Sequence, residues 1–221
     1  MNEYNKNILF DLDGTLTDSK IGITQSLSYA LNELKIEVPA NLDWCIGPPL
    51  QNSLAKILGE KNAVFFNEVL KLYRERFEEK GMFENEVYQG IEQLLNNLSE
   101  MKFKMFVATS KPEVYAKKII KHFNLEKYFL GVYGSELSGK DSDKATIIKK
   151  IFQEEKIVCT SAIMIGDRSH DLIGAKANNV DALGVLWGYG SKEELEDENP
   201  YGVAKDPADL KLKIVCWSKN R

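Results

Sequence analysis

The chain has few of the residues that build disulfide frameworks or transition-metal sites. Its 221 residues include three cysteines, Cys45, Cys159 and Cys216, and two histidines. The cysteines are odd in number, far apart and without C-x-x-C spacing, which argues against both a disulfide-stabilised and a zinc-binding fold. Reduced thiols are typical of cytoplasmic proteins, and we expect a cytoplasmic location.

Long apolar runs and basic clusters are also missing. No uninterrupted apolar stretch is long enough to span a bilayer, and the polar start of the chain does not resemble a signal peptide. The net charge is −4, with acidic and basic residues mixed along the chain. We therefore expect neither a membrane nor a nucleic acid polymer as partner. No feature of the sequence indicates the oligomeric state.

Apolar periodicity divides the chain into a helical block and an alternating block. A short apolar run at 7–10 reads as a buried strand that ends in an Asp-x-Asp-Gly turn. Residues 19–81 carry apolar positions at helical spacing and no convincing strand. Beyond them, strands are expected at 103–108, 129–133, 162–165 and 182–186, with helices at 91–101, 112–122, 143–152 and 171–178. The weakly patterned tail carries one expected helix near 208–214.

Strand-helix alternation predicts an α/β fold with a Rossmann-like, doubly wound parallel sheet and helices on both faces. The first strand belongs in that sheet, so the helical block is an insertion. We expect a catalytic core formed by 1–17 and 83–221 and an all-helical cap domain formed by 18–82.

Polar residues follow three of the predicted strands, where ligands bind in open α/β sheets. They are Asp11 and Asp13, then Thr109, Ser110 and Lys111, and finally Asp167 and Asp171. Clustered carboxylates repel one another unless a cation neutralises them. Oxygen ligands without nearby Cys or His favour Mg²⁺, for which Asp11 and Asp167 are suitable ligands. Thr109 and the backbone near Ser110 can bind phosphate oxygens.

Four motifs in the same order resemble those of the haloacid dehalogenase superfamily. The run FDLDGTLTDS at 10–19 resembles its first motif, Thr109 its second, Lys144 its third and GDRSHD at 166–171 its fourth. The chain is most similar to the phosphoglycolate-phosphatase-like group and, within it, to the 5'-nucleotidase-like branch. That similarity includes the segments 47–50, 73–77, 108–112, 134–137 and 184–190.

The resemblance implies a Mg²⁺-dependent phosphatase that acts on a small phosphate ester, such as a nucleoside 5'-monophosphate or phosphoglycolate. Asp11 would attack phosphorus as nucleophile, and Asp13 would serve as general acid and base. Thr109, Ser110 and Lys144 would hold the phosphoryl oxygens.

The resemblance also implies the metal ligands. Asp11 and Asp167 would bind Mg²⁺ directly, and Asp13 through its backbone carbonyl. Asp171 would bind the ion through water or orient Lys144.

Other interpretations of these residues stay open. An Asp-x-Asp-Gly turn can be structural or calcium-binding, and Thr109 and Ser110 could cap the following helix. Lys140 competes with Lys144 for the role of site lysine, and the contribution of Lys111 is undecided.

Other functions stay open too. A phosphomutase of the β-phosphoglucomutase type shares the four motifs, and a non-catalytic phosphate-binding module would keep the fold. A phosphonatase would need a Schiff-base lysine that the sequence does not single out. A dehalogenase is disfavoured because Asp13 suits protonation of an alkoxide.

Overall fold

A six-stranded parallel sheet forms the centre of the computed structural model, which describes residues 6–220. The first five residues of the predicted core segment, and Arg221, lie outside the described residues. The strand order is β5-β4-β1-β6-β7-β8. The strands are β1 (Asn7–Phe10), β4 (Lys104–Pro112), β5 (Gly131–Ser135), β6 (Ala162–Gly166), β7 (Asp181–Val185) and β8 (Gly202–Ala204).

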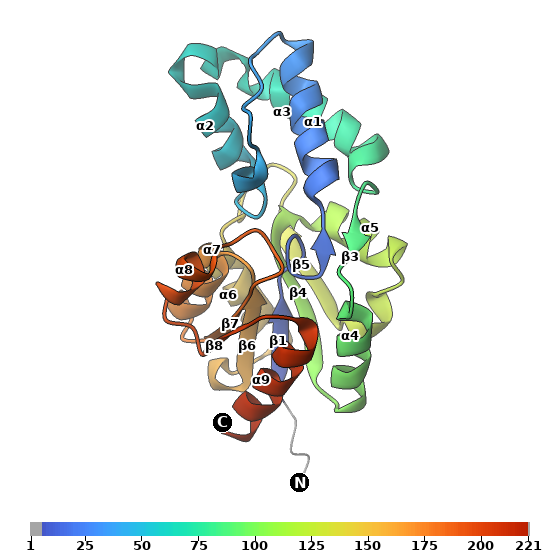
Figure 1. Ribbon diagram of the computed structural model, residues 1–221, viewed down its shortest axis with the longest axis vertical. Coiled ribbons are helices and arrows are strands. Elements are labelled where there is room, and N and C mark those ends of the chain that lie inside the picture. The colour runs from blue at the N-terminus through green and yellow to red at the C-terminus, as the bar shows by residue number, and fades with distance from the viewer. Residues whose placement is uncertain (1–5, 221) are drawn as a thin grey trace.

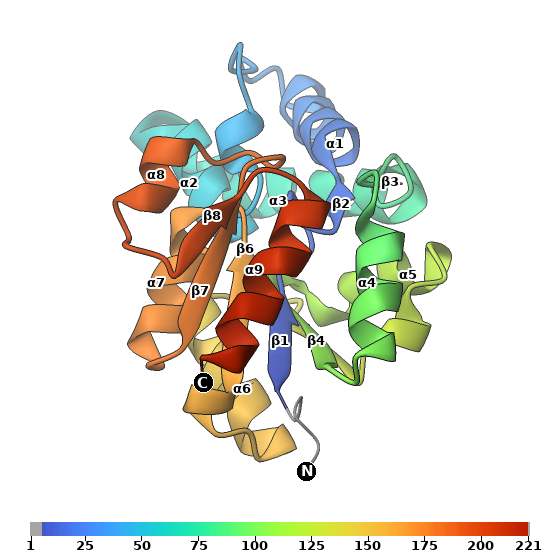
Figure 2. The same cartoon turned by 60° about the horizontal axis from the view of Figure 1, so that its bottom comes forward.

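Helices cover both faces of this sheet, as the alternating pattern predicts (Figures 1 and 2). Side chains from α4 (Ile91–Glu100), α5 (Glu113–His122) and α9 (Pro207–Lys219) form one core with the inward residues of the strands. Side chains from α6 (Lys144–Glu155) and α7 (Ser169–Ala177) form the other. Successive strand residues point to opposite faces, so Ile8 and Phe10 join the first core and Leu9 joins the second.

Local sequence signals explain where several helices form. In α4, Ile91, Leu94, Leu95 and Leu98 are buried on one helical face. The carboxylate of Asp143 caps α6 by accepting a hydrogen bond from the Thr146 amide at 2.8 Å.

The inserted block lies beyond one end of the sheet, at the top of Figure 1. It contains α1 (Lys20–Glu33), α2 (Leu50–Asn62) and α3 (Phe66–Arg76), with short 3-10 turns at Asp43–Cys45 and Ala63–Phe65 and a π-helical turn at Phe77–Gly81. No strand occurs among the described residues 19–85, as the helical spacing at 19–81 predicts, but Asp18, which the predicted cap includes, lies in a strand.

A two-stranded antiparallel sheet joins the insertion to the core. Its strands, β2 (Thr17–Asp18) and β3 (Glu86–Val87), pair where the chain enters and leaves the helical block. Next to it, α1 lies so close to the π-helical turn that a Cβ on Gly22 would be 1.9 Å from the carbonyl oxygen of Gly81. Strands of two residues have no detectable period, so the sequence pattern does not predict this sheet.

The C-terminal tail is more regular than its pattern suggests. It contains α8 (Lys192–Glu196) and the edge strand β8 in addition to α9, which is longer than expected. Of the described residues, no helix combines the length and apolar character that crossing a bilayer requires.

Candidate active site

Three buried carboxylates meet at the carboxyl end of the sheet. Asp11 follows β1 and Asp167 follows β6, and these two strands pair in parallel with Phe10 opposite Ile165. Asp171 comes from the first turn of α7. One oxygen from each carboxylate lies within 4.8 Å of one oxygen from each of the others. The structure therefore brings together three of the residues for which the sequence predicts metal binding.

Lys144 provides the positive charge of this cluster. Its Nζ lies 2.8 Å from Oδ1 of Asp11 and 2.7 Å from Oδ1 of Asp171, and it donates a hydrogen bond to the Ala108 carbonyl at 2.7 Å. Burial alone would lower the pKa of Lys144, but attraction to the two carboxylates outweighs burial and raises that pKa above its usual value. Lys144 is therefore a cation at neutral pH. The competing Lys140 is exposed, and its Nζ lies 3.7 Å from Oε1 of Glu136.

Asp11 and Asp167 lie in a setting that disfavours their ionised forms. Burial raises the pKa of Asp11 to about 7 against the opposing effect of Lys144, and repulsion by Asp171 adds to the rise. Burial, followed by repulsion from Asp171 and Asp11, also raises the pKa of Asp167 well above its usual value. A divalent cation would reverse these effects by favouring the ionised carboxylates.

Asp13 lies beside this cluster and is paired with Lys111. Its Oδ2 is 2.9 Å from Nζ of Lys111, and both side chains are almost fully buried. Its Oδ1 is buried without a hydrogen-bond partner among the described residues. Lys111 is therefore a buried partner of Asp13 and not a surface residue.

Gly14 allows the turn that follows Asp13 to approach Asp167 closely. Its φ is +86°, and a Cβ at this position would lie 2.3 Å from Oδ2 of Asp167. Any other residue would be strained and would displace the carboxylate.

Thr109 and Ser110 are buried near the end of β4. The sequence pattern predicts that this strand ends at Ala108, but β4 continues to Pro112 after an irregularity in its pairing with β5. Thr109 Oγ1 accepts a hydrogen bond from the Lys111 amide at 3.3 Å. Ser110 Oγ has no partner within the described part of the chain, and Ser110 lines the adjoining cavity.

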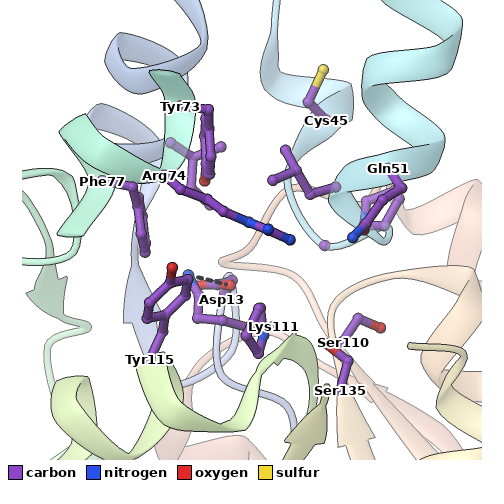
Figure 3. A pocket seen from close by; sticks show the side chains of 15 residues that line it. Asp13, Cys45, Gln51, Tyr73, Arg74, Phe77, Ser110, Lys111, Tyr115 and Ser135 are labelled. Atoms are coloured by element: carbon purple, nitrogen blue, oxygen red, sulfur yellow. Dashed lines mark ion pairs between the residues drawn. The ribbon is translucent and has the colours of Figure 1, made fainter. Parts of the chain in front are cut away.

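A cavity separates this site from the helical insertion (Figure 3). On the insertion side, Tyr73 stacks on Phe77 with ring centroids 5.4 Å apart, and Phe77 also contacts Tyr115 of the core at 5.6 Å. Arg74 extends across the cavity and donates a hydrogen bond to the Leu137 carbonyl. The aromatic residues of this lining could not be identified from the sequence, because their common direction depends on how α3 packs.

Comparison with known proteins supports the interpretation of these motifs. The family of haloacid dehalogenase-like hydrolases matches residues 8–185. A 5'-nucleotidase from Pseudomonas aeruginosa is 43% identical over 207 residues, which are 93% of each chain. The tyrosine-protein kinase PtkA from Mycobacterium tuberculosis is 34% identical over 86% of this chain and 65% of its own length. A phosphoglycolate phosphatase from Aquifex aeolicus is 31% identical over 92% of this chain and 93% of its own.

Solved structures show the same similarity. A crystal structure of a predicted phosphatase from Clostridium acetobutylicum superimposes with a TM-score of 0.90 and 43% identity, over 95% of this chain and 98% of the other. The family match covers most of the chain, and the named relatives include phosphatases. The chain is therefore an enzyme that belongs to the haloacid dehalogenase-like hydrolases.

Proposed function

We propose that the protein is a Mg²⁺-dependent phosphomonoester hydrolase that forms a phospho-aspartyl intermediate on Asp11. The observation that carries this proposal is the convergence of three buried carboxylates at the end of the sheet, two of which, Asp11 and Asp171, pair with Lys144. The similarity to a 5'-nucleotidase and to a phosphoglycolate phosphatase supports it.

The carboxylates of Asp11, Asp167 and Asp171 fit a hard divalent cation, because they offer oxygen ligands close together with no nitrogen or sulfur donor among them. The backbone carbonyl of Asp13 is a further candidate ligand, suggested by the family resemblance. Bound Mg²⁺ supplies positive charge that offsets the charge of the phosphoryl oxygens.

In the first step, an oxygen of Asp11 forms a bond to phosphorus while the ester bond to the leaving oxygen breaks. Asp13 must enter this step in its protonated form, and it donates that proton to the leaving oxygen. Thr109, Ser110 and Lys144 bind the phosphoryl oxygens and hold the group in position. The products of this step are the free alcohol and phosphorylated Asp11.

In the second step, Asp13 accepts a proton from water as the water oxygen attacks phosphorus. The bond between phosphorus and Asp11 breaks, so that inorganic phosphate leaves and the carboxylate of Asp11 is restored. The ion pair with Lys111 keeps the carboxyl group of Asp13 in the cavity, beside the place where the leaving group must lie.

The cavity lining suggests the leaving group. Aromatic rings and the Arg74 guanidinium face the space beside Asp13 (Figure 3). Such a lining suits a nucleoside better than a two-carbon acid, because planar bases pack well against aromatic rings. We propose a nucleoside 5'-monophosphate as the first candidate substrate and phosphoglycolate as the second.

We also propose that residues 18–82 form a cap that moves over the core of 1–17 and 83–221. The hinges lie near Asp18 and residues 82–84, at the two-stranded sheet. Closure would keep bulk water from the phosphoryl group. Small phosphate esters and free thiols are both consistent with a cytoplasmic enzyme.

The test is release of inorganic phosphate from nucleotides, sugar phosphates and phosphoglycolate, with Mg²⁺ or with EDTA. We expect Mg²⁺-dependent release by the wild type, none by Asp11→Asn, and full release by Asp197→Asn, which changes an exposed carboxylate of the core. Phosphate release by Asp11→Asn equal to that of the wild type would refute the assignment of Asp11 as the nucleophile. Isomer formation without release would identify a phosphomutase, and binding without turnover would identify a non-catalytic module.

A further inference from the structure

The loop at 187–190, which follows β7, is pressed against Asp167. A Cβ on Gly188 would lie 2.4 Å from the Cβ of Asp167, and a Cβ on Gly190 would lie 2.0 Å from its carbonyl oxygen. Trp187 fixes the other side of the loop, because its Nε1 donates a hydrogen bond to the Thr15 carbonyl at 3.0 Å. The loop therefore has little freedom to move independently of Asp167.

Tyr189 extends from this loop in two directions. Its backbone N–H donates a hydrogen bond to Oδ2 of Asp167 at 2.8 Å, and its hydroxyl donates one to Oδ1 of Asp18 at 2.8 Å. Burial, followed by the neighbouring Tyr88 and Asp18, raises the pKa of the Tyr189 phenol above its usual value. The hydroxyl therefore keeps its proton at neutral pH and can donate to the carboxylate of Asp18.

Asp18 belongs to the junction between core and insertion. It lies in β2 opposite Glu86 of β3, and its Oδ1 also accepts a hydrogen bond from the Lys20 amide, where α1 begins, at 3.0 Å. A movement of α1 about this junction must therefore carry Asp18 with it or break one of these hydrogen bonds.

We propose that Tyr189 is a positioning residue that couples the junction of the helical insertion to the metal-binding carboxylate Asp167. Cap closure and the placement of Asp167 then favour each other, because Tyr189 donates hydrogen bonds to the carboxylates of both Asp167 and Asp18 in this arrangement. Coupling of this kind is reciprocal, so a cation that fixes Asp167 also stabilises the junction. The inference rests on the proposed function, since it takes Asp167 as a ligand of Mg²⁺.

The experiment compares the full-length wild type with Tyr189→Phe, which removes only the hydroxyl. Tyr201→Phe is the matched control, because its hydroxyl contacts Asn220 far along the chain from the junction. Calorimetry measures Mg²⁺ affinity without substrate, and amide hydrogen exchange is followed at 17–22 and 82–88 with and without Mg²⁺.

In the wild type and in Tyr201→Phe, Mg²⁺ is expected to slow exchange at the junction. Tyr189→Phe is expected to bind Mg²⁺, because the hydrogen bond from its backbone N–H to Asp167 is kept. The Mg²⁺-dependent decrease in exchange rate at the junction is expected to be smaller than in the wild type by about fivefold or more. A purely structural role would change exchange equally with and without the ion. If Tyr189→Phe does not fold, Asp18→Asn, which weakens the acceptor, is expected to reduce the same response.

An equal Mg²⁺-dependent slowing in the wild type and Tyr189→Phe, or none in a wild type that binds Mg²⁺, would overturn the coupling. The proposed function would survive either result if Mg²⁺-dependent phosphate release persisted. A wild type that neither binds Mg²⁺ nor releases phosphate would overturn both proposals.

Discussion

Metal-free protein should lose stability as the pH rises, because Asp11 is buried beside two other carboxylates. The pKa of Asp11 is about 7 in the folded protein, whereas an unperturbed aspartate, as in an unfolded chain, has a pKa of 3.8. The folded state therefore holds the proton more tightly than the unfolded state. The proton on Asp11 therefore adds to the free energy of unfolding. This contribution is fully present below pH 3.8 and is lost as the pH rises through 7. The difference between the two pKa values corresponds to about 4 kcal/mol at most.

The assay is urea unfolding in EDTA between pH 4.5 and 8, with Asp11→Asn as the reference. Asparagine does not titrate, so the difference between the two proteins reports the Asp11 carboxyl group together with its effect on the titration of Asp167. The free energy of unfolding of the wild type should fall relative to that of the variant as the pH rises. A difference that does not change with pH, or that changes in favour of the wild type, would refute the reasoning.

Mg²⁺ should reverse this loss. The ion binds ionised carboxylates, so its stabilising effect should grow over the same range of pH in which the metal-free protein weakens. At a concentration a hundred times its Kd, a ligand that binds only the folded state adds about 2.7 kcal/mol. Asp11→Asn should gain less, because one ligand carries no charge.

Two further substitutions test the packing of the site and of the junction. Lys144→Met should cost about 3–5 kcal/mol in urea unfolding near neutral pH, because it leaves two buried carboxylates without their cation. Lys140→Met, at an exposed ammonium group, is the control, and an equal cost in both would contradict the burial argument. Gly22→Ala should cost about 1–3 kcal/mol in thermal unfolding, because its Cβ would overlap the carbonyl of Gly81. Gly202→Ala, whose nearest neighbour would be 3.4 Å away, should cost less, and the reverse order would contradict the prediction.

The order of long elements could be predicted from the sequence because each carries its own periodic pattern. The helix α4 shows buried residues at helical spacing, and the expected range 91–101 agrees with Ile91–Glu100. By contrast, β2 and β8 are two and three residues long and exist through pairing with distant strands. The continuation of β4 to Pro112 likewise depends on contacts with β5 that no local pattern contains.

The convergence of Asp11, Thr109 and Asp167 could be predicted because the motifs place them at strand ends, and parallel strands bring such ends together. The ion-pair and hydrogen-bond partners of the site residues could not be predicted from the sequence. The Lys111–Asp13 ion pair joins two strand ends at a distance set by side-chain packing. Tyr189 lies 22 residues from Asp167 in a loop whose composition suggests only a turn, although its glycines are the signal that another group approaches closely.

The charges of the site explain why the same residues suit both a divalent cation and a phosphoryl group. The cluster holds three carboxylates and the ammonium group of Lys144, which pairs with Asp11 and Asp171, whereas Asp13 pairs separately with Lys111. Two negative charges are therefore left without compensation, which is the charge of one Mg²⁺ ion. Without the ion, the raised pKa values of Asp11 and Asp167 mean that protons supply the missing charge. A proton on Asp11 would disable the proposed nucleophile, so the proposed mechanism requires that the metal, and not protons, neutralise the site before it accepts a phosphoryl group.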